Sequence, residues 1–379
     1  MRIILSGAIG RSVTGGQAWA NLQYLIGLRA LGHEVFYLED CGGWSTVHNW
    51  ETNEPTWDLD YPAGFVRACL EPFGFGGRWI YRAGDESRGL SLADFSEVCR
   101  AADLLIVRGI PFLEWRRDYE LPRRRAFIDV DPGFTQIRLA RGEPAFAETL
   151  ARCEALFTVG RHVGAADCSI PTAGREWMRT VPPVVLSEWP AATSSDDGAF
   201  TSIVRWRGLK DVEWEGVKYG QRDRELLSYL SLPQLTSQRL QIALTGGGSE
   251  KCVAAGWDVT PGWLPSRTVD TYRQYIQQSR GELTVAKHCY VATRSGWFSD
   301  RSVCYLASGR PVLVQDTGLG DWLPVGEGIL VFRDLDQAVE AIDAVNADYP
   351  RHRRAARRLA ESHFAAERVL PELIANVFR

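Results

Sequence analysis

The sequence predicts an α/β fold in which two doubly wound, Rossmann-like domains face a central cleft. Its 379 residues are enough for two domains of ordinary size. Apolar segments of strand length alternate with helical patterns in both halves of the chain, which is typical of parallel βαβ units. A proline- and serine-rich stretch over residues 181–199 separates the two halves and predicts a linker.

The first half opens with a buried strand expected over Arg2–Ser6, followed by a glycine-rich loop. Apolar residues then recur at helical spacing over Ala18–Leu31, and Gly32 ends that helix before a second strand over Glu34–Leu38. A strand, a helix and a strand of this length form a parallel βαβ unit. Further buried strands are expected over Leu104–Val107, Ala126–Val130 and Ala155–Val159.

The second half is expected to begin with a strand over Phe200–Val204, directly after the Ser194-Ser195-Asp196-Asp197-Gly198 part of the linker. Later strands fit Leu240–Leu244, Leu283–Ala286 and Val312–Val314. We therefore assign an N-terminal, acceptor-side domain to residues 1–190 and a C-terminal, donor-side domain to residues 200–354. The last helix, over 355–379, is a candidate to pack back on the first domain. Ligands of such sheets bind outside the carboxyl ends of the strands, so we expect the site in the cleft.

The bulk composition narrows the classes of function. A net charge of −4 argues against a general nucleic-acid binder, so no nucleic-acid partner is expected. No run of about 18 apolar residues occurs, so no membrane span is expected. The eight cysteines contain no C-x-x-C pair, which argues against a zinc site and a disulfide framework and favours free thiols in the cytoplasm.

A loop followed by a helix start is the most informative motif. Ser299 suits the N-cap of a helix and Asp300 its first turn, and the free backbone N–H groups of a helix start bind anions. We expect this segment to bind a diphosphate through Ser295, Gly296, Trp297, Phe298, Ser299, Asp300 and Arg301.

Other cations and glycines are candidates for the same site. Arg205 and Lys210 follow the first strand of the second half and suit neutralisation of a leaving diphosphate, and the alternative is a solvated loop. Lys287 follows a later strand, where it either touches the nucleotide or caps the sheet. Gly15 and Gly16 precede a helix and permit close approach to a ligand, or only form a turn. The glycine spacing is not that of a dinucleotide-binding fingerprint.

Acid–base candidates lie in the first half. Asp129 and Asp131 alternate at the end of a strand, so both carboxylates are expected on one side, and two close carboxylates split their pKa values. The alternative is turn chemistry at Asp131-Pro132-Gly133, with Asp129 as a cap. His162, after the strand that ends at Val159, is the next candidate for the base.

These segments resemble the GT-B glycosyltransferases over nearly the whole chain. The opening strand, glycine loop and helix with Leu31-Gly32-His33-Glu34-Val35 are similar to their N-terminus, and Arg205 with Lys210 is similar to their diphosphate-binding pair. The segment from Leu306 to Leu313 is similar to their helix and Gly-x-Pro strand beyond the donor site. Two glutamates of common retaining members are replaced by Gly296 and Cys304, and the loop 12–17 lacks the histidine of inverting relatives.

The resemblance implies a metal-independent transferase that moves a sugar from a nucleoside-diphosphate donor to a small-molecule or lipid-linked acceptor. The nucleotide sugar is then a co-substrate, and no cofactor or metal is expected. A nucleotide-sugar 2-epimerase and a non-catalytic binding or activator subunit are the alternatives. The apolar stretch over Phe65–Phe75 forms either an acceptor pocket or core. The sugar, the nucleobase, the acceptor, the stereochemistry and the oligomeric state are left open.

Overall fold

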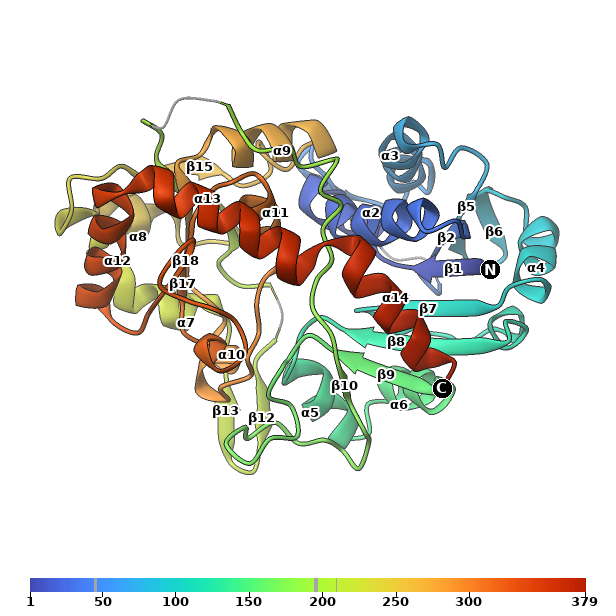
Figure 1. Cartoon of the computed structure of the whole chain (residues 1–379). Coiled ribbons are helices and arrows are strands. Elements are labelled where there is room, and N and C mark those ends of the chain that lie inside the picture. The colour runs from blue at the N-terminus through green and yellow to red at the C-terminus, as the bar shows by residue number, and fades with distance from the viewer. Residues whose placement is uncertain (44–45, 194–196, 209) are drawn as a thin grey trace.

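The computed structural model describes residues 1–43, 46–193, 197–208 and 210–379. Two α/β halves lie side by side, and the C-terminal helices run from the second half across to the first (Figure 1). Residues 194–196 of the predicted linker lie outside the described residues, whereas the strands predicted on either side of the linker are present.

The first half is built on an eight-stranded sheet with the order β10-β9-β8-β7-β1-β2-β5-β6. Its neighbouring strands pair in parallel except for β5 and β6, which are antiparallel. The strands are β1 (Arg2–Ser6), β2 (Glu34–Asp40), β5 (Trp79–Ala83), β6 (Glu86–Gly89), β7 (Leu104–Arg108), β8 (Arg124–Asp129), β9 (Ala155–Thr158) and β10 (Met178–Arg179).

Helices connect these strands, as parallel pairing requires. They are α1 (Ile9–Ser12), α2 (Gly15–Ala30), α3 (Asp60–Leu70), α4 (Leu92–Arg100), α5 (Phe134–Ala140) and α6 (Pro144–Ala151), with a small hairpin of β3 (Val47–Asn49) and β4 (Glu54–Thr56). Helix α2 begins earlier than the apolar pattern predicts, because Thr14 caps it by accepting a hydrogen bond from the backbone N–H of Gln17.

The second half is built on an entirely parallel six-stranded sheet with the order β15-β14-β11-β16-β17-β18. Its strands are β11 (Phe200–Arg205), β14 (Leu240–Thr245), β15 (Asp258–Pro261), β16 (Gly281–Thr284), β17 (Val312–Gln315) and β18 (Ile329–Phe332). The strands β12 (Val212–Trp214) and β13 (Val217–Tyr219) form a separate antiparallel hairpin. Its helices are α7 (Arg222–Leu226), α8 (Ser249–Ala254), α9 (Val269–Gln278), α10 (His288–Ala292), α11 (Asp300–Ala307) and α12 (Leu335–Ala347).

The C-terminal segment is two helices, where the sequence predicts one. Helix α13 (Tyr349–Leu359) packs on α11, a π-helical turn over Ala360–Phe364 follows, and α14 (Ala366–Val377) packs on α2 of the first half. At the turn, the Val184 N–H donates to the carbonyl oxygen of Phe364, 2.7 Å away. The C-terminal helix therefore lies against the first half, beside its edge strands (Figure 1).

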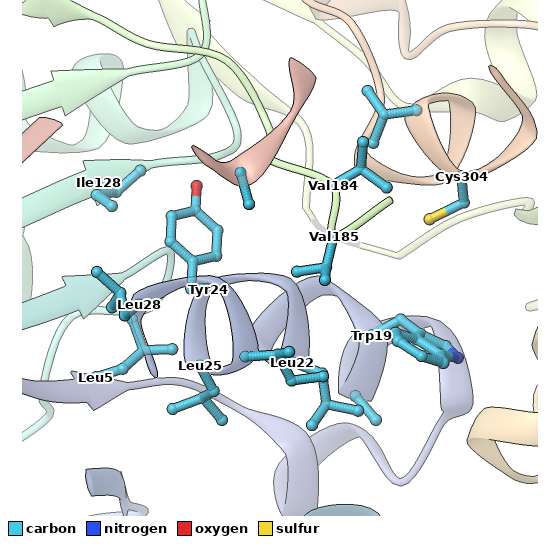
Figure 2. Close-up of a cluster of buried hydrophobic side chains, with 14 of the residues drawn as sticks. Leu5, Trp19, Leu22, Tyr24, Leu25, Leu28, Ile128, Val184, Val185 and Cys304 are labelled. Carbon is cyan, nitrogen blue, oxygen red and sulfur yellow. The ribbon is translucent and has the colours of Figure 1, made fainter. Parts of the chain in front are cut away.

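A continuous apolar cluster joins the halves, around the buried helix α2 (Figure 2). Trp19 of α2 meets Trp189 of the linker edge to face with ring centroids 4.9 Å apart, and its indole N–H donates to the Val269 carbonyl oxygen at 2.8 Å. The Gln23 side chain accepts from the Val185 N–H at 2.7 Å and contacts Cys304 of α11. These contacts fix the two sheets relative to each other.

The strand orders show where ligands bind. Strand β1 lies between β2 and β7, and β11 lies between β14 and β16, so the connections leave in opposite directions at both central strands. In such sheets the loops beyond the carboxyl ends of the central strands open a crevice. The two crevices face each other, and the predicted fold class of two Rossmann-like domains is confirmed.

Candidate functional site

A cavity of about 360 Å³ lies between the two halves. The first half contributes the glycine loop, and the second contributes the carboxyl ends of β11 and β14 and the start of α11. Its walls include Ser12, Gly16, Gln17, Trp50, Arg205, Thr245, Trp263, Asp300 and Arg301. A second cavity of about 210 Å³ shares Gln17, Asp300 and Arg301 with the first and includes Arg108, Asp131, Arg222, Lys287, Tyr290 and Trp297. Together these two cavities form the cleft site.

Arg205 and Lys210, predicted as a pair, have different surroundings. Arg205 ends β11, is exposed, and lines the first cavity. Its guanidinium forms no ion pair with any described residue, whereas that of Arg207 pairs with Asp211 and Asp223 at 2.9 Å each. Lys210 is exposed and lines neither of the two cavities of the cleft site. The structure thus brings Arg205, and not Lys210, to the cleft.

Arg222 is a buried cation of the cleft that the sequence did not single out. It begins α7, donates from Nε to the Val285 carbonyl oxygen at 2.7 Å, and forms no ion pair with a described carboxylate. Burial, followed by the nearby charge of Arg301, lowers the pKa of Arg222 to about 10. An anion bound between the guanidinium groups of Arg222 and Arg301 would relieve the repulsion between them. No spacing signal marks Arg222, since its neighbours come from distant segments.

Asp131 and Lys287 meet across the cleft. The Lys287 ammonium forms an ion pair with the Asp131 carboxylate, and the Tyr290 hydroxyl donates to the same oxygen. Burial acts to raise the pKa of Asp131, but the charge and hydrogen bond of Lys287, with the bond from Tyr290, outweigh it and hold this pKa below its ordinary value. Asp131 is therefore ionised at neutral pH, and Lys287 reaches the cleft from the N-cap position of α10.

Asp129, the other predicted carboxylate, is sealed inside the first half. It accepts hydrogen bonds from Thr135 and Thr158 at 2.6 Å, from Gln136 at 2.8 Å and from the Asp131 N–H at 3.0 Å. Burial raises its pKa, and these bonds oppose the shift. The carboxylate organises the turn after β8 and has no exposed surface, so the prediction of Asp129 as a base is corrected to a structural role.

His162, the remaining base candidate, is turned away from the cleft. Its Nδ1 lies 2.8 Å from the Arg294 carbonyl oxygen, and its Nε2 lies 3.5 Å from Asp321. It lines neither cavity of the cleft site, so it holds the loop before Gly296 instead of reaching a substrate. Its ring, Asp167 and Asp321 bring ligand atoms within 4.8 Å of one another, but Arg294 already pairs with both carboxylates.

The predicted helix start is present, with its N-terminus partly occupied. Ser299 caps α11 and accepts from the Arg301 N–H at 3.2 Å, and Asp300 accepts from the same N–H at 2.9 Å. Asp300 also pairs with Arg108 of β7 at 3.2 Å, across the two halves. The Arg301 guanidinium is held by the buried Glu282, by Thr284 and by the Ile203 carbonyl oxygen. A carboxylate thus already occupies the position expected for the diphosphate.

The loop before α11 is shaped mainly by packing. Gly296 has a left-handed φ of +68°, and its N–H donates to the Thr317 carbonyl oxygen at 2.7 Å. Ser295 is buried and accepts from the Trp297 N–H at 3.3 Å. Trp297 packs on Tyr290 and Phe298 stacks on Phe364, while both line the second cavity. Trp297 and Phe298 therefore offer the cleft an aromatic wall.

Gly15 and Gly16 lie so close to the second half that a side chain would not fit, which the sequence did not reveal. The Gly15 N–H donates to the Ser266 carbonyl oxygen at 2.6 Å, and a Cβ on Gly15 would lie 2.1 Å from the Thr268 carbonyl oxygen. A Cβ on Gly16 would lie 2.9 Å from the Tyr272 ring. These glycines allow the glycine loop to touch the second half, and Gly16 also lines the first cavity.

A larger, mostly apolar cavity of about 600 Å³ lies beside the first. Its lining includes Val13, Tyr61, Phe65 and Phe73 from the first half and Val269 from the second. Trp50 lines both cavities and donates from its indole N–H to the Val13 carbonyl oxygen at 3.2 Å. Part of the Phe65–Phe75 stretch therefore lines a pocket, and Phe75 is core.

Comparison with known proteins agrees with this layout. Residues 222–373 match a family described as glycosyl transferase-like. The chain has the fold of the GT-B glycosyltransferases, and its second half is glycosyl transferase-like in sequence. No curated protein matches its sequence. Similar solved structures include an alpha-glucosyltransferase in complex with UDP and a 13-mer DNA, with 12% identity, 100% coverage of both chains and a TM-score of 0.62. A sucrose-phosphate synthase from Thermosynechococcus elongatus has 14% identity, coverage of 100% of this chain and 99% of its own, and a TM-score of 0.54.

A lipopolysaccharide outer core galactosyltransferase is also similar to this chain, with 12% identity, 99% coverage of both chains and a TM-score of 0.52. The expectation of no nucleic-acid partner is wrong, because several neighbours of this fold are glucosyltransferases bound to UDP and DNA. Net charge misleads here, since local basic surface decides phosphate contacts. No helix of the described residues is long and apolar enough to cross a membrane.

Proposed function

We propose that this glycosyltransferase takes its sugar from a nucleoside-diphosphate donor bound in the cleft site, without a metal ion or a cofactor. One observation carries the proposal: cations that lack carboxylate partners converge there. Arg205 lines the first cavity with no ion pair among the described residues, and Arg222 lines the second with only carbonyl contacts. Guanidinium groups bind diphosphate oxygens through paired hydrogen bonds.

The chemistry of transfer needs positive charge at this place. When the bond between the sugar C1 and the diphosphate oxygen breaks, its electron pair stays on the diphosphate. Fixed cations in a partly closed site stabilise that developing charge without reorganisation. Arg205, Arg222 and Lys287 take the role that a divalent metal takes in other transferases. Asp300, which competes with an anion for the first turn of α11, is paired with Arg108 and is thereby partly neutralised.

We assign Asp131 as the general base that accepts the proton of the acceptor hydroxyl. Among the predicted base candidates, Asp129 and His162 line neither cavity of the cleft site, whereas Asp131 lines the second, with 36% of its side chain exposed. The ammonium of Lys287 weakens Asp131 as a base while the cleft is empty. A bound diphosphate attracts Lys287, which frees the carboxylate to accept the proton.

The acceptor carries an apolar group in this proposal. The apolar cavity beside Trp50 is large enough for an aromatic or short acyl group, and it adjoins the cavity of Arg205. A small-molecule or lipid-linked acceptor fits this lining. Because glucosyltransferases of this fold are bound to DNA, nucleic acid belongs in the same acceptor screen. The eight cysteines, all unpaired, support work in the reducing cytoplasm.

Donor binding is tested by calorimetry with UDP and TDP. Arg205→Ala is expected to weaken binding by about tenfold, the worth of one charge-assisted contact. Arg207→Ala is the matched control, because Arg207 is exposed on the same loop but lines neither cavity and pairs with Asp211 and Asp223. Absence of binding by either nucleotide at about 1 mM, a weak affinity for such a site, would overturn the donor assignment.

Transfer is tested by nucleotide release from a panel of nucleotide sugars, with and without a metal chelator. Release that needs an acceptor and survives chelation supports the proposal. Asp131→Asn is expected to slow release by about 100-fold, the scale of a lost general base. Epimer formation from UDP-N-acetylglucosamine alone would instead identify the 2-epimerase, which shares the nucleotide site and needs no acceptor.

A further inference from the structure

A polar hollow of about 270 Å³ lies away from the cleft, where α14 meets the edge of the first sheet. Three parts of the chain form it: the turn after β9, the segment that follows β10, and the π-helical turn with α14. Trp322 of the second half closes one side. The hollow thus lies where both halves and the C-terminal helix meet, and the cleft site does not include it.

Three arginines line this hollow: Arg161, Arg179 and Arg368. None of them forms an ion pair with any described residue. The Nε of Arg161 is buried and has no hydrogen-bond partner among the described residues, and its guanidinium lies over the Trp322 ring, 5.3 Å from the centroid. A buried donor without an acceptor is costly, and it indicates a missing partner.

The charges of the lining match a doubly charged anion. Glu372 is the one acidic side chain among the lining residues, so the three arginines keep a surplus of two positive charges. Burial, and after it the charge of Arg179, lower the pKa of Arg161. Burial lowers the pKa of His363 as well, with Arg368 adding to the shift, so this ring is neutral at pH 7. A phosphate monoester carries about −1.5 to −2 at pH 7 and offers three acceptor oxygens.

We propose that this hollow, the hinge site, binds a small phosphate-bearing molecule. Arg161, Arg179 and Arg368 line the same hollow, as recognition of a single phosphate group requires. A nucleic acid, by contrast, needs a positively charged track along which its backbone can run. The lining also includes the apolar side chains of Phe157, Val181 and Trp322, which suit a compact organic group attached to the phosphate.

The hinge site is connected to the cleft by a short path. A Cβ on Gly296 would lie 3.0 Å from the Arg161 Cβ, so Arg161 packs directly against the loop that carries Trp297 into the cleft site. The next residue, His162, donates from its backbone N–H to the Ser295 carbonyl oxygen at 3.1 Å. A ligand that fixes Arg161 therefore also fixes the cleft loop, and by thermodynamic linkage it changes donor affinity.

Calorimetry with inorganic phosphate as the probe tests the hinge site, on full-length protein whose cleft is first saturated with UDP. One equivalent of phosphate is expected to bind. Arg179→Gln and Arg368→Gln are each expected to weaken phosphate binding by about tenfold and to leave UDP binding within about twofold. Both side chains are exposed, so neither change disturbs the core. Arg358→Gln, an exposed arginine on α13 outside the hollow, is the control and should change neither affinity.

The outcomes separate this proposal from the proposed function. No phosphate binding by the UDP-saturated protein at about 10 mM, or equal binding by both variants and the wild type, would overturn the hinge site while leaving the donor site intact. Displacement of phosphate by a short DNA duplex, with the same loss in both variants, would overturn the small-molecule assignment and identify a nucleic-acid contact instead. If the wild type does not bind UDP, the donor proposal is refuted, but the hinge site can still be tested. Phosphate is then titrated into the protein without UDP, and the hinge site predicts weaker phosphate binding in Arg368→Gln but not in Arg205→Ala.

Discussion

Gly15→Ala tests whether the glycine loop is fixed by contact with the second half. The added Cβ would lie 2.1 Å from the Thr268 carbonyl oxygen and 2.8 Å from its carbonyl carbon. An ordinary contact needs about 3.4 Å, so the loop and the 266–272 segment must separate by more than about 1 Å. Both partners are backbone, so no side chain can rotate to make room.

The expected cost follows from two effects. Overpacking of this kind costs about 1–3 kcal/mol. The separation also stretches the 2.6 Å hydrogen bond from the Gly15 N–H to Ser266, worth about 1 kcal/mol. Since alanine is the better helix former at the start of α2, about 0.5 kcal/mol is regained, which leaves a loss of about 1.5–3.5 kcal/mol. With an unfolding entropy of about 2 cal/mol/K per residue over 379 residues, the melting temperature falls by about 2–5 °C.

Thermal unfolding and UDP calorimetry on the same samples provide the measurement. Because Gly16 lines the first cavity, donor affinity should fall together with stability in Gly15→Ala. Gly64→Ala is the matched control: it lies within α3, nothing lies within 4 Å of its added Cβ, and the better helix former should raise stability by about 0.5–1 kcal/mol. Equal melting temperatures for the Gly15→Ala variant and the wild type would refute the reasoning.

Two further predictions concern buried carboxylates. Asp129→Asn replaces an acceptor of four hydrogen bonds by an amide that faces donors, so urea unfolding should show a loss of about 1–3 kcal/mol. A loss of UDP-binding free energy larger than the loss of unfolding free energy would contradict the structural role of Asp129. Arg301→Gln leaves Glu282 buried and unpaired, with an expected loss of about 3–5 kcal/mol. The double variant with Glu282→Gln should regain part of it, and strict additivity would argue against the pair.

The sequence predicts the central strands of both sheets well, because these strands are short apolar runs followed by loops and helices. β1 begins and ends at the predicted residues, and β11, β14 and β17 differ from the prediction by one residue. Strands β5 and β18 were not predicted, because Trp79–Ala83 contains an arginine and β18 follows a glycine-rich loop without a clear start. The break between α13 and α14 depends on Phe364 accepting from Val184, a contact 180 residues apart along the chain.

Residues of the candidate site could be predicted only where neighbouring residues in the sequence determine their position. The cap at Ser299 and the place of Arg205 follow from neighbouring residues, and both predictions match the structure. The difference between Asp129 and Asp131 does not: one is surrounded by Thr135, Gln136 and Thr158, and the other meets a lysine from the second half. Strand alternation fixes the side of the sheet on which a carboxylate lies but not the residues that it contacts. The different surroundings of Asp129 and Asp131 therefore become visible only in the three-dimensional structure.

Lys287→Met tests the proposed control of Asp131 by its cation. In the wild type the pKa of Asp131 is held below its ordinary value, so this carboxylate stays ionised until the pH is low. Without the ammonium, burial is the dominant remaining influence and the pKa rises. This moves the acid limb of the kcat/KM profile for nucleotide release, which reports the free enzyme, to higher pH. Lys251→Met, on the exposed face of α8, is the control and should leave this limb in place.

The pH dependence of the unfolding free energy is a second test of the Lys287–Asp131 pair. A carboxylate with a lowered folded pKa contributes stability above its unfolded pKa, and this contribution is lost as the pH falls through the folded pKa. The wild type should therefore exceed Lys287→Met at pH 7 by about 1 kcal/mol or less, since Asp131 is 36% exposed, and the difference should shrink in acid. An acid limb that does not move, together with a stability difference independent of pH, would show that Lys287 does not control Asp131.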